Sequence, residues 1–126
     1  MKLHADRLDG VNGVFGHGPG ELSVNGTAYR HAVIVPWQGE VLAWDVADFD
    51  GLGPAHFQAV AALSPELVIF GSGARIRFPS PAWLRPLIER GIGVETMDTG
   101  AACRTYNVLA AEGRSVVLAA LLTPAP

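Results

Sequence analysis

The chain has 126 residues, of which 49% are hydrophobic and 17% are charged, a composition typical of one folded domain rather than of a disordered segment. Its net charge is −3 and its Lys and Arg residues form no stripe, so we expect no binding to nucleic acid. The single cysteine, Cys103, excludes an internal disulfide and a cysteine-cluster zinc site, and the histidines show no metal-ligand spacing.

The first twenty residues show little sign of regular structure. The segment from Met1 to Asp6 lacks the apolar stretch of a secretory signal, so we expect a cytoplasmic protein. Residues 9–20 contain five glycines and one proline, which leave few side chains to pack. We therefore predict a single domain over 1–126, made of an irregular glycine-rich lead-in over 1–20 and a folded core over 21–122.

A β-hairpin is the first regular element that the sequence predicts. The pair Asn25-Gly26 accepts the positive φ angles of a type I′ turn between two antiparallel strands. We expect the second strand to continue through 32–35 and stop near Pro36, and a further strand to cover 41–44. The first third of the chain is thus predicted to be a β meander.

Helices and strands alternate from Pro54 onward. Apolar residues at helical spacing follow Pro54 and end at Ser64, and the continuous apolar run 67–70 predicts a central strand covered on both faces. A second helix follows Ser80-Pro81. Because a proline inside a helix costs about 3 kcal/mol, Pro86 means that this helix either kinks or begins near residue 84.

The C-terminal part predicts a strand over 93–97, a helix over 99–111 capped by Asp98, and a last strand over 115–122 whose direction stays open. The longest apolar run, 116–122, is shorter than the about 20 residues that a membrane span requires, so we expect no span. The order β-α-β-α-β implies right-handed crossovers and parallel strands. Together these elements predict a three-layer α/β domain with a mixed central sheet, to which the hairpin contributes antiparallel strands.

The loops after two of these strands form the candidate site. If strands 67–70 and 93–97 are parallel neighbours, their carboxyl ends lie on one edge of the sheet, where backbone N–H groups attract anions. The predicted crevice residues are Gly71, Ser72, Gly73, Arg75, Asp98, Thr99, Gly100 and Cys103. The alternative is a purely structural turn, which Asp98 favours because its carboxylate would already occupy the helix cap.

The sequence predicts no catalytic, cofactor-binding or metal-binding residue. Gly71-Ser72-Gly73 follows a strand, but Ile76 stands where a dinucleotide-binding fingerprint has its third glycine. Cys103 near a helix start has the position of an activated thiol, yet a small buried residue in a closely packed helix is the interpretation that we favour. We expect Tyr106 and Asn107 to hydrogen-bond to a neighbouring loop and to fix the crevice rather than to catalyse a reaction.

Several segments of this sequence resemble one small family. They are Val24–Gly26, Gly71–Gly73, the block Glu95–Leu109 and Glu112–Arg114, and the block Met97–Asn107 is the most specific of them. The resemblance covers roughly residues 14–122. It is to a domain-of-unknown-function family of bacteria and archaea, the Mth-type small α/β domains.

Relatives in that family include a mitochondrial NADH dehydrogenase (complex I) assembly factor and an adipogenesis-associated Mth-domain-containing protein. The resemblance implies a compact three-layer α/β fold with a mixed sheet. It implies no reaction, cofactor or catalytic residue, and it favours a role in binding protein partners, because the mitochondrial relative acts in that way.

Three functional hypotheses follow. The first is a non-enzymatic protein-binding or assembly-factor-like module, with a protein partner or self-association. The second is a domain that binds a small anion or metabolite, or catalyses a reaction, in the crevice between the Gly71–Gly73 loop and the helix start at Asp98–Gly100. The third is a structural homodimer.

Overall fold

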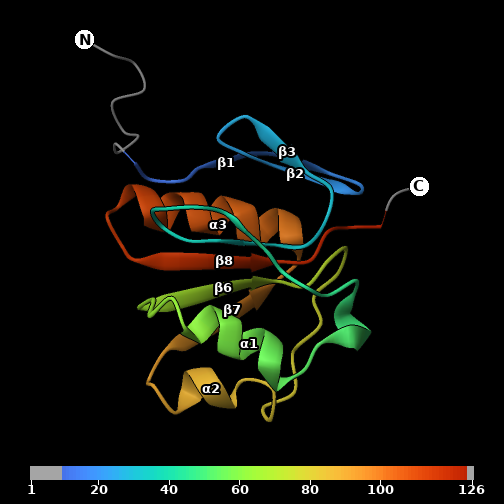
Figure 1. Cartoon of the computed structure of the whole chain (residues 1–126). Coiled ribbons are helices and arrows are strands. Elements are labelled where there is room, and N and C mark those ends of the chain that lie inside the picture. The colour runs from blue at the N-terminus through green and yellow to red at the C-terminus, as the bar shows by residue number, and fades with distance from the viewer. Residues whose placement is uncertain (1–9, 125–126) are drawn as a thin grey trace.

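Residues 10–124 are described by a computed structural model, in which helices and sheets stack in layers (Figure 1). A five-stranded sheet lies at the centre, with one long helix on one face and two shorter helices on the other. A separate three-stranded sheet covers the outer side of the long helix. The mixed α/β fold with a mixed central sheet is therefore confirmed.

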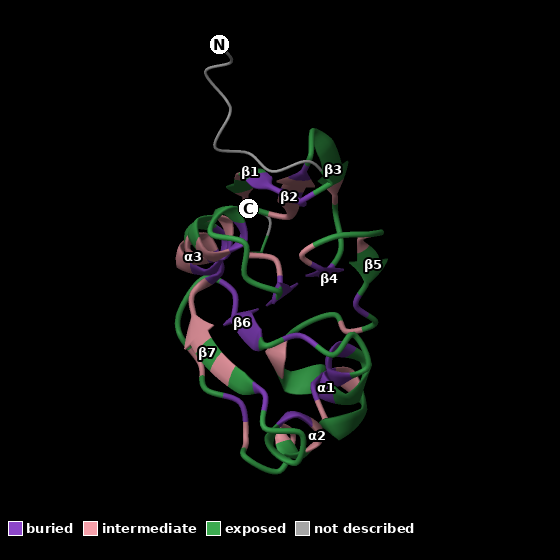
Figure 2. Cartoon of the chain, turned by 90° about the vertical axis from the view of Figure 1, so that its left-hand side faces the viewer, coloured by how far each residue is buried: buried purple, intermediate pink, exposed green. Residues whose placement is uncertain are grey.

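The central sheet contains both parallel and antiparallel strands. Its strands, in order across the sheet, are β5 (Leu42–Ala43), β4 (Val33–Val35), β8 (Val116–Ala120), β6 (Leu67–Gly71) and β7 (Gly93–Met97). Strand β6 runs parallel to both β7 and β8, whereas β4 is antiparallel to β8 and to β5. All residues of β6 and β8 are buried, as Figure 2 shows for β6, which confirms the predicted central strand.

The second sheet contains the predicted hairpin. Its three antiparallel strands are β1 (Val14–Gly18), β2 (Glu21–Val24) and β3 (Thr27–Tyr29). The turn between β2 and β3 has φ angles of 53° at Asn25 and 89° at Gly26, as a type I′ turn requires.

The predicted irregular lead-in is wrong at residues 14–18. Residues 14–18 form β1, and Val11 and Val14 are buried. The sequence pattern did not predict this strand, because glycines have no side chains to show the alternation of buried and exposed positions. Pairing with β2 and contacts with the long helix hold its backbone extended. Residues 1–9 of the lead-in lie outside the described residues.

The predicted β meander is also wrong. Strand β3 ends at Tyr29, and the chain then leaves the small sheet to form β4 in the central one. Residues of β3 are mostly exposed while β4 is fully buried, so the two strands belong to different layers. The antiparallel strands of the mixed sheet are thus β4 and β5, and the hairpin takes no part in it.

The helices agree with the sequence pattern. They are α1 (Pro54–Ala61), α2 (Arg85–Ile88) and α3 (Thr99–Ala111), with a short 3₁₀ turn, η1 (Phe49–Gly51), before α1. Helix α2 starts after Leu84, so the later of the two predicted starts is correct and Pro86 falls in its first turn, where a proline is tolerated. Asp98 caps α3 as predicted, since its Oδ1 accepts from the Ala101 N–H at 2.9 Å.

Each face of the central sheet has its own hydrophobic core. Because side chains alternate along a strand, Ile69 and Leu118 face α3, whereas Phe70 and Val117 face α1 and α2. Helix α3 adds Tyr106 to the first core, which extends to the small sheet. The long helix is therefore held between two sheets, and its N-terminus comes to the edge where β6 and β7 end.

Candidate functional site

The two predicted loops contact each other directly. The Ser72 N–H donates to the Met97 carbonyl at 2.9 Å, and the Thr99 N–H donates to the Gly73 carbonyl at 2.9 Å. The loops after β6 and β7 therefore meet at one edge of the central sheet, as the parallel pairing predicts.

The polar groups between these loops bind one another. The Thr99 hydroxyl accepts from the Gly73 N–H at 2.9 Å and donates to the Leu121 carbonyl at 2.6 Å. The Asp98 carboxylate caps the helix and accepts from a further N–H group at the helix start, that of Ala101. On the outer side, a Cβ atom at Gly100 would lie 2.9 Å from Cε1 of His17, which covers this part of the helix. The contact between the loops is thus a closed structural junction.

Cys103 lies inside the first core rather than at an accessible edge. Its side chain is buried among the residues that join α3 to the two sheets. Burial raises the pKa of the Cys103 thiol to about 11, so the thiol keeps its proton at neutral pH. This position agrees with the interpretation of Cys103 as a small buried residue in a closely packed helix. It does not agree with an activated nucleophile, which needs an accessible thiol of lowered pKa.

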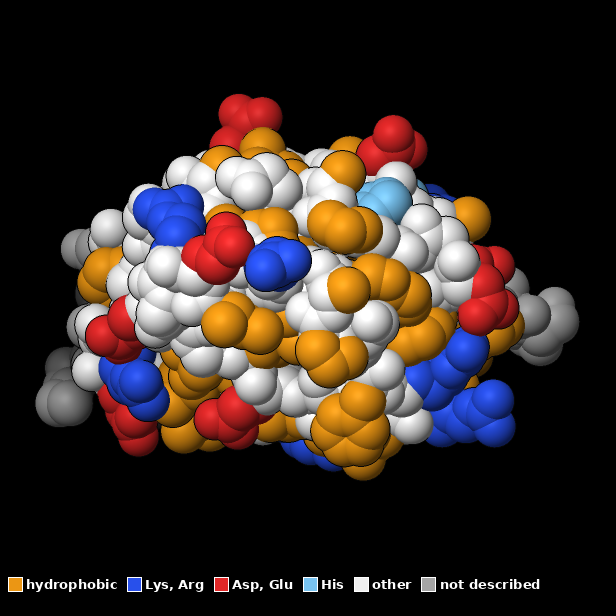
Figure 3. All heavy atoms as spheres, turned by 90° about the horizontal axis from the view of Figure 1, so that it is seen from below, with side chains coloured by type: hydrophobic (Ala, Val, Ile, Leu, Met, Phe, Trp, Pro, Cys, Tyr) orange, Lys and Arg blue, Asp and Glu red, His pale blue; other side chains and the backbone are white. Residues whose placement is uncertain are grey.

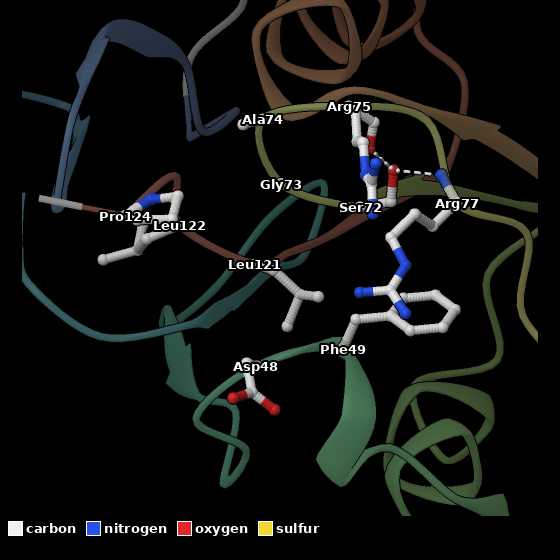
Figure 4. A pocket seen from close by; sticks show the side chains of 10 residues that line it. All are labelled: Asp48, Phe49, Ser72, Gly73, Ala74, Arg75, Arg77, Leu121, Leu122 and Pro124. Carbon is white, nitrogen blue, oxygen red and sulfur yellow. Dashed lines mark hydrogen bonds between the residues drawn. The ribbon is translucent and has the colours of Figure 1, made fainter.

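A pocket of about 250 Å³ lies on the other side of the Gly71–Gly73 loop. Three of the predicted residues, Ser72, Gly73 and Arg75, line it (Figure 4). Arg77, which like Arg75 was expected from the sequence to add positive charge at this edge, also lines the pocket. The other lining residues were not predicted: Asp48, Phe49, Ala74, Leu121, Leu122 and Pro124. Asp98, Thr99, Gly100 and Cys103 are not among the lining residues of this pocket.

Ser72 fixes the loop that presents the two arginines. Its hydroxyl donates to the Arg75 carbonyl at 2.7 Å and accepts from the Arg77 N–H at 3.0 Å (Figure 4). The Met97 carbonyl, at 3.0 Å, is a second acceptor for the same hydroxyl. The Arg77 guanidinium carbon lies 4.1 Å from the centre of the Phe49 ring. The loop shape is therefore set by one buried serine.

The most specific block of the sequence, 97–107, has a structural role. The Tyr106 hydroxyl lies 3.0 Å from the Asn12 carbonyl and 3.1 Å from the Pro36 carbonyl. The side chain of Asn107 accepts from the Val14 N–H at 2.9 Å and donates to the Val14 carbonyl. The predicted hydrogen bonds of Tyr106 and Asn107 thus exist. They hold β1, the segment before it and the end of β4 on α3, and they do not involve the Gly71–Gly73 loop.

Within residues 10–124, no group of three or more His, Cys, Asp or Glu side chains is placed to hold a metal ion. Over the same range, no helix is long and apolar enough to cross a membrane.

The sequence matches, over residues 14–122, a family described as protein of unknown function (DUF498/DUF598). The chain belongs to this family. A Bos taurus relative named NADH dehydrogenase (ubiquinone) 1 alpha subcomplex assembly factor 3 is 40% identical over 86 residues, which cover 67% of this chain and 46% of that protein. The chain thus spans about half the length of this curated relative.

Solved structures agree with this DUF498/DUF598 assignment. A crystal structure of a Bordetella parapertussis protein is 39% identical, with a TM-score of 0.86, and covers 92% of this chain and 99% of that chain. A solution structure of a Bordetella pertussis protein, described as a Mth938-like domain, is 34% identical, with a TM-score of 0.86, and covers 99% of this chain and 94% of that chain. The Mth-type family that the sequence resembles is therefore confirmed.

Proposed function

We propose that this protein is a non-enzymatic protein-binding module with an assembly-factor-like role. The observation that carries the proposal is the similarity to the Bos taurus protein, whose name is that of an assembly factor. The chemistry of the described residues supports it. The one thiol is buried with a raised pKa, and the polar side chains of the 97–107 block hold the fold together.

Apolar side chains on the surface give such a module something to bind with. Phe78 is 74% exposed and Ile76 is 53% exposed in the segment between β6 and α2, and Ile88 is 59% exposed on α2. Figure 3 shows hydrophobic side chains gathered on the face that α1 and α2 form. Large exposed apolar side chains that lie together mark surfaces where proteins associate.

Affinity capture with cross-linking, from the cells that make this protein, tests the proposal. We expect a protein partner at a constant, near-stoichiometric ratio. We also expect Ile88→Ser to lower its recovery about fivefold or more, because the change removes a large exposed apolar side chain from this face. Repeated recovery of the protein alone would contradict the proposal. Recovery of a second copy only, confirmed by light scattering over a range of concentrations, would favour self-association instead.

Val108→Ser is the matched control for that experiment. Val108 is 58% exposed, almost the same fraction as Ile88, but it lies on α3 rather than on α2. The partner should be recovered with this variant as with the unchanged protein. Equal loss with both variants would assign the loss to a general effect on the protein.

A further inference from the structure

The pocket beside the Gly71–Gly73 loop has one charged side and one apolar side. Figure 4 draws Arg75 and Arg77 on one side and Leu122 and Pro124 on the other, with Leu121 between them. A molecule that spans this pocket meets a guanidinium group at one end and hydrocarbon at the other. We propose that the pocket binds a small monocarboxylate with a short aliphatic or aromatic body.

Arg75 is the residue that would bind the carboxylate. The charge of Arg77 is already engaged, since its guanidinium lies 3.1 Å from Oδ1 of Asp50 and stacks on Phe49. Within residues 10–124 the Arg75 guanidinium has no ion pair, although its backbone is fixed by Ser72. A guanidinium group binds a carboxylate through two parallel hydrogen bonds, which a neutral amide cannot match.

The acidic residue of the pocket does not oppose this assignment. The Asp48 carboxylate accepts from the Gly51 N–H at 3.2 Å, where it caps the 3₁₀ turn. In Figure 4 this carboxyl group points away from Leu121. The carboxylate end of the molecule and Asp48 therefore occupy different parts of the pocket.

The volume limits the size of the molecule. A cavity of about 150 Å³ binds benzene, which has six non-hydrogen atoms, so a pocket of about 250 Å³ has room for about eight to ten. A carboxylic acid with four to six carbons, such as 4-methylpentanoate, has this size. A molecule with so few atoms binds weakly, and we expect a dissociation constant of about 1 mM.

Titration of the isotope-labelled full chain, followed by amide NMR shifts, tests this assignment with 4-methylpentanoate as the probe. We expect saturable shifts at Ser72–Arg77 and Leu121–Thr123, and binding at least about threefold weaker for 4-methylpentanamide, which has the same shape without the charge. Acetate, which lacks the apolar body, should also bind more weakly. Absence of saturable shifts with 4-methylpentanoate, or equal binding of its amide, would overturn the proposal.

Two variants complete the experiment. Arg75→Gln should weaken binding of 4-methylpentanoate about threefold or more, because it removes the charge from an exposed position without disturbing the core. Arg104→Gln, at an exposed position on α3 that does not line the pocket, should leave the affinity unchanged. Unchanged affinity in Arg75→Gln would overturn the role of this residue and with it the proposal. Since the titration needs no protein partner, its failure is separate from a failure of the proposed function.

Discussion

Tyr106 joins three parts of the chain that are far apart in sequence. Its hydroxyl contacts the carbonyls of Asn12 and Pro36, and the Asn12 side chain in turn donates to the Pro36 carbonyl at 2.8 Å and accepts from the Asn25 side chain at 2.8 Å. Buried polar groups are stable only when such partners are present. One tyrosine on α3 therefore holds the hairpin turn and the end of β4 in place.

Replacement of Tyr106 by phenylalanine removes these hydrogen bonds and keeps the ring. We expect the free energy of unfolding to fall by about 1–2 kcal/mol, since the buried carbonyls lose a donor. Urea denaturation measures this change. Val108→Ala, on the exposed side of the same helix, serves as the control and should change stability by less than about 0.5 kcal/mol. Equal stability of Tyr106→Phe and the unchanged protein would contradict the hydrogen-bonding role.

Two buried acids on α3 make the protein sensitive to alkali. Burial raises the pKa of Cys103 from 9.0 to about 11, and burial also raises the pKa of the Tyr106 phenol. Both groups hold their protons more tightly in the folded state. The contribution of Cys103 to stability is therefore complete below about pH 9 and is lost as the pH rises through about 11. The contribution of Tyr106 is complete below about pH 10 and is lost only at a higher pH than that of Cys103.

Cys103→Ala tests this pH dependence. The free energy of unfolding of the unchanged protein should decrease between about pH 8 and pH 11, and the decrease should be smaller by about 2 kcal/mol in the variant, because one of the two buried acids is gone. Urea denaturation at a series of pH values gives both curves. Parallel curves would mean that the thiol does not titrate differently in the folded and unfolded states.

At the scale of elements, α3 packs on β6 at very short range. A Cβ atom at Gly71 would lie 3.0 Å from the Thr99 hydroxyl oxygen and 3.2 Å from the Ala102 Cβ. Gly71 and Ala102 are small enough for the helix start to reach the strand end, where Thr99 binds the Gly73 loop. The close packing of α3 on β6 thus depends on small residues at these two positions.

Gly71→Ala should disturb that junction. The added methyl group pushes α3 away from the sheet, and we expect a loss of about 1–3 kcal/mol in the free energy of unfolding. Gly18→Ala is the matched control, because its Cβ would meet nothing within 4 Å. Thermal or urea denaturation of the two variants gives the comparison. A larger effect at Gly18 than at Gly71 would contradict the packing argument.

The elements from Pro54 onward were predictable because their pattern is local. Proline and aspartate mark the starts of α1 and α3, and the unbroken apolar run 67–70 marks β6. Strand β1 was not predictable, because its glycines give no alternating pattern. One of the residues that hold this strand, Asn107, is also far away in the sequence. The site was predictable in part. Parallel pairing placed the two loops together, but no local signal brings Phe49 or Leu121 to Gly73.

At the scale of the whole molecule, the layers differ in how many partners their strands have. Strands β6 and β8 have a neighbour on both sides and are fully buried, whereas β3 lies at the edge of the small sheet with exposed residues. Amide hydrogen exchange should therefore be slowest in β6 and β8, where it requires global unfolding, and much faster in β3. Mass spectrometry or NMR measures these rates. Equal protection of β3 and β8 would show that the two sheets open only together.

The position of β8 also has a consequence for biosynthesis. This strand lies between β4 and β6, yet the ribosome makes it after the other four strands of its sheet. Until residues 116–120 have left the exit tunnel, β4 and β6 each lack a partner on one side, and an unpaired strand edge invites aggregation. The central sheet can thus close only after β8 has been made, in the step that inserts its middle strand.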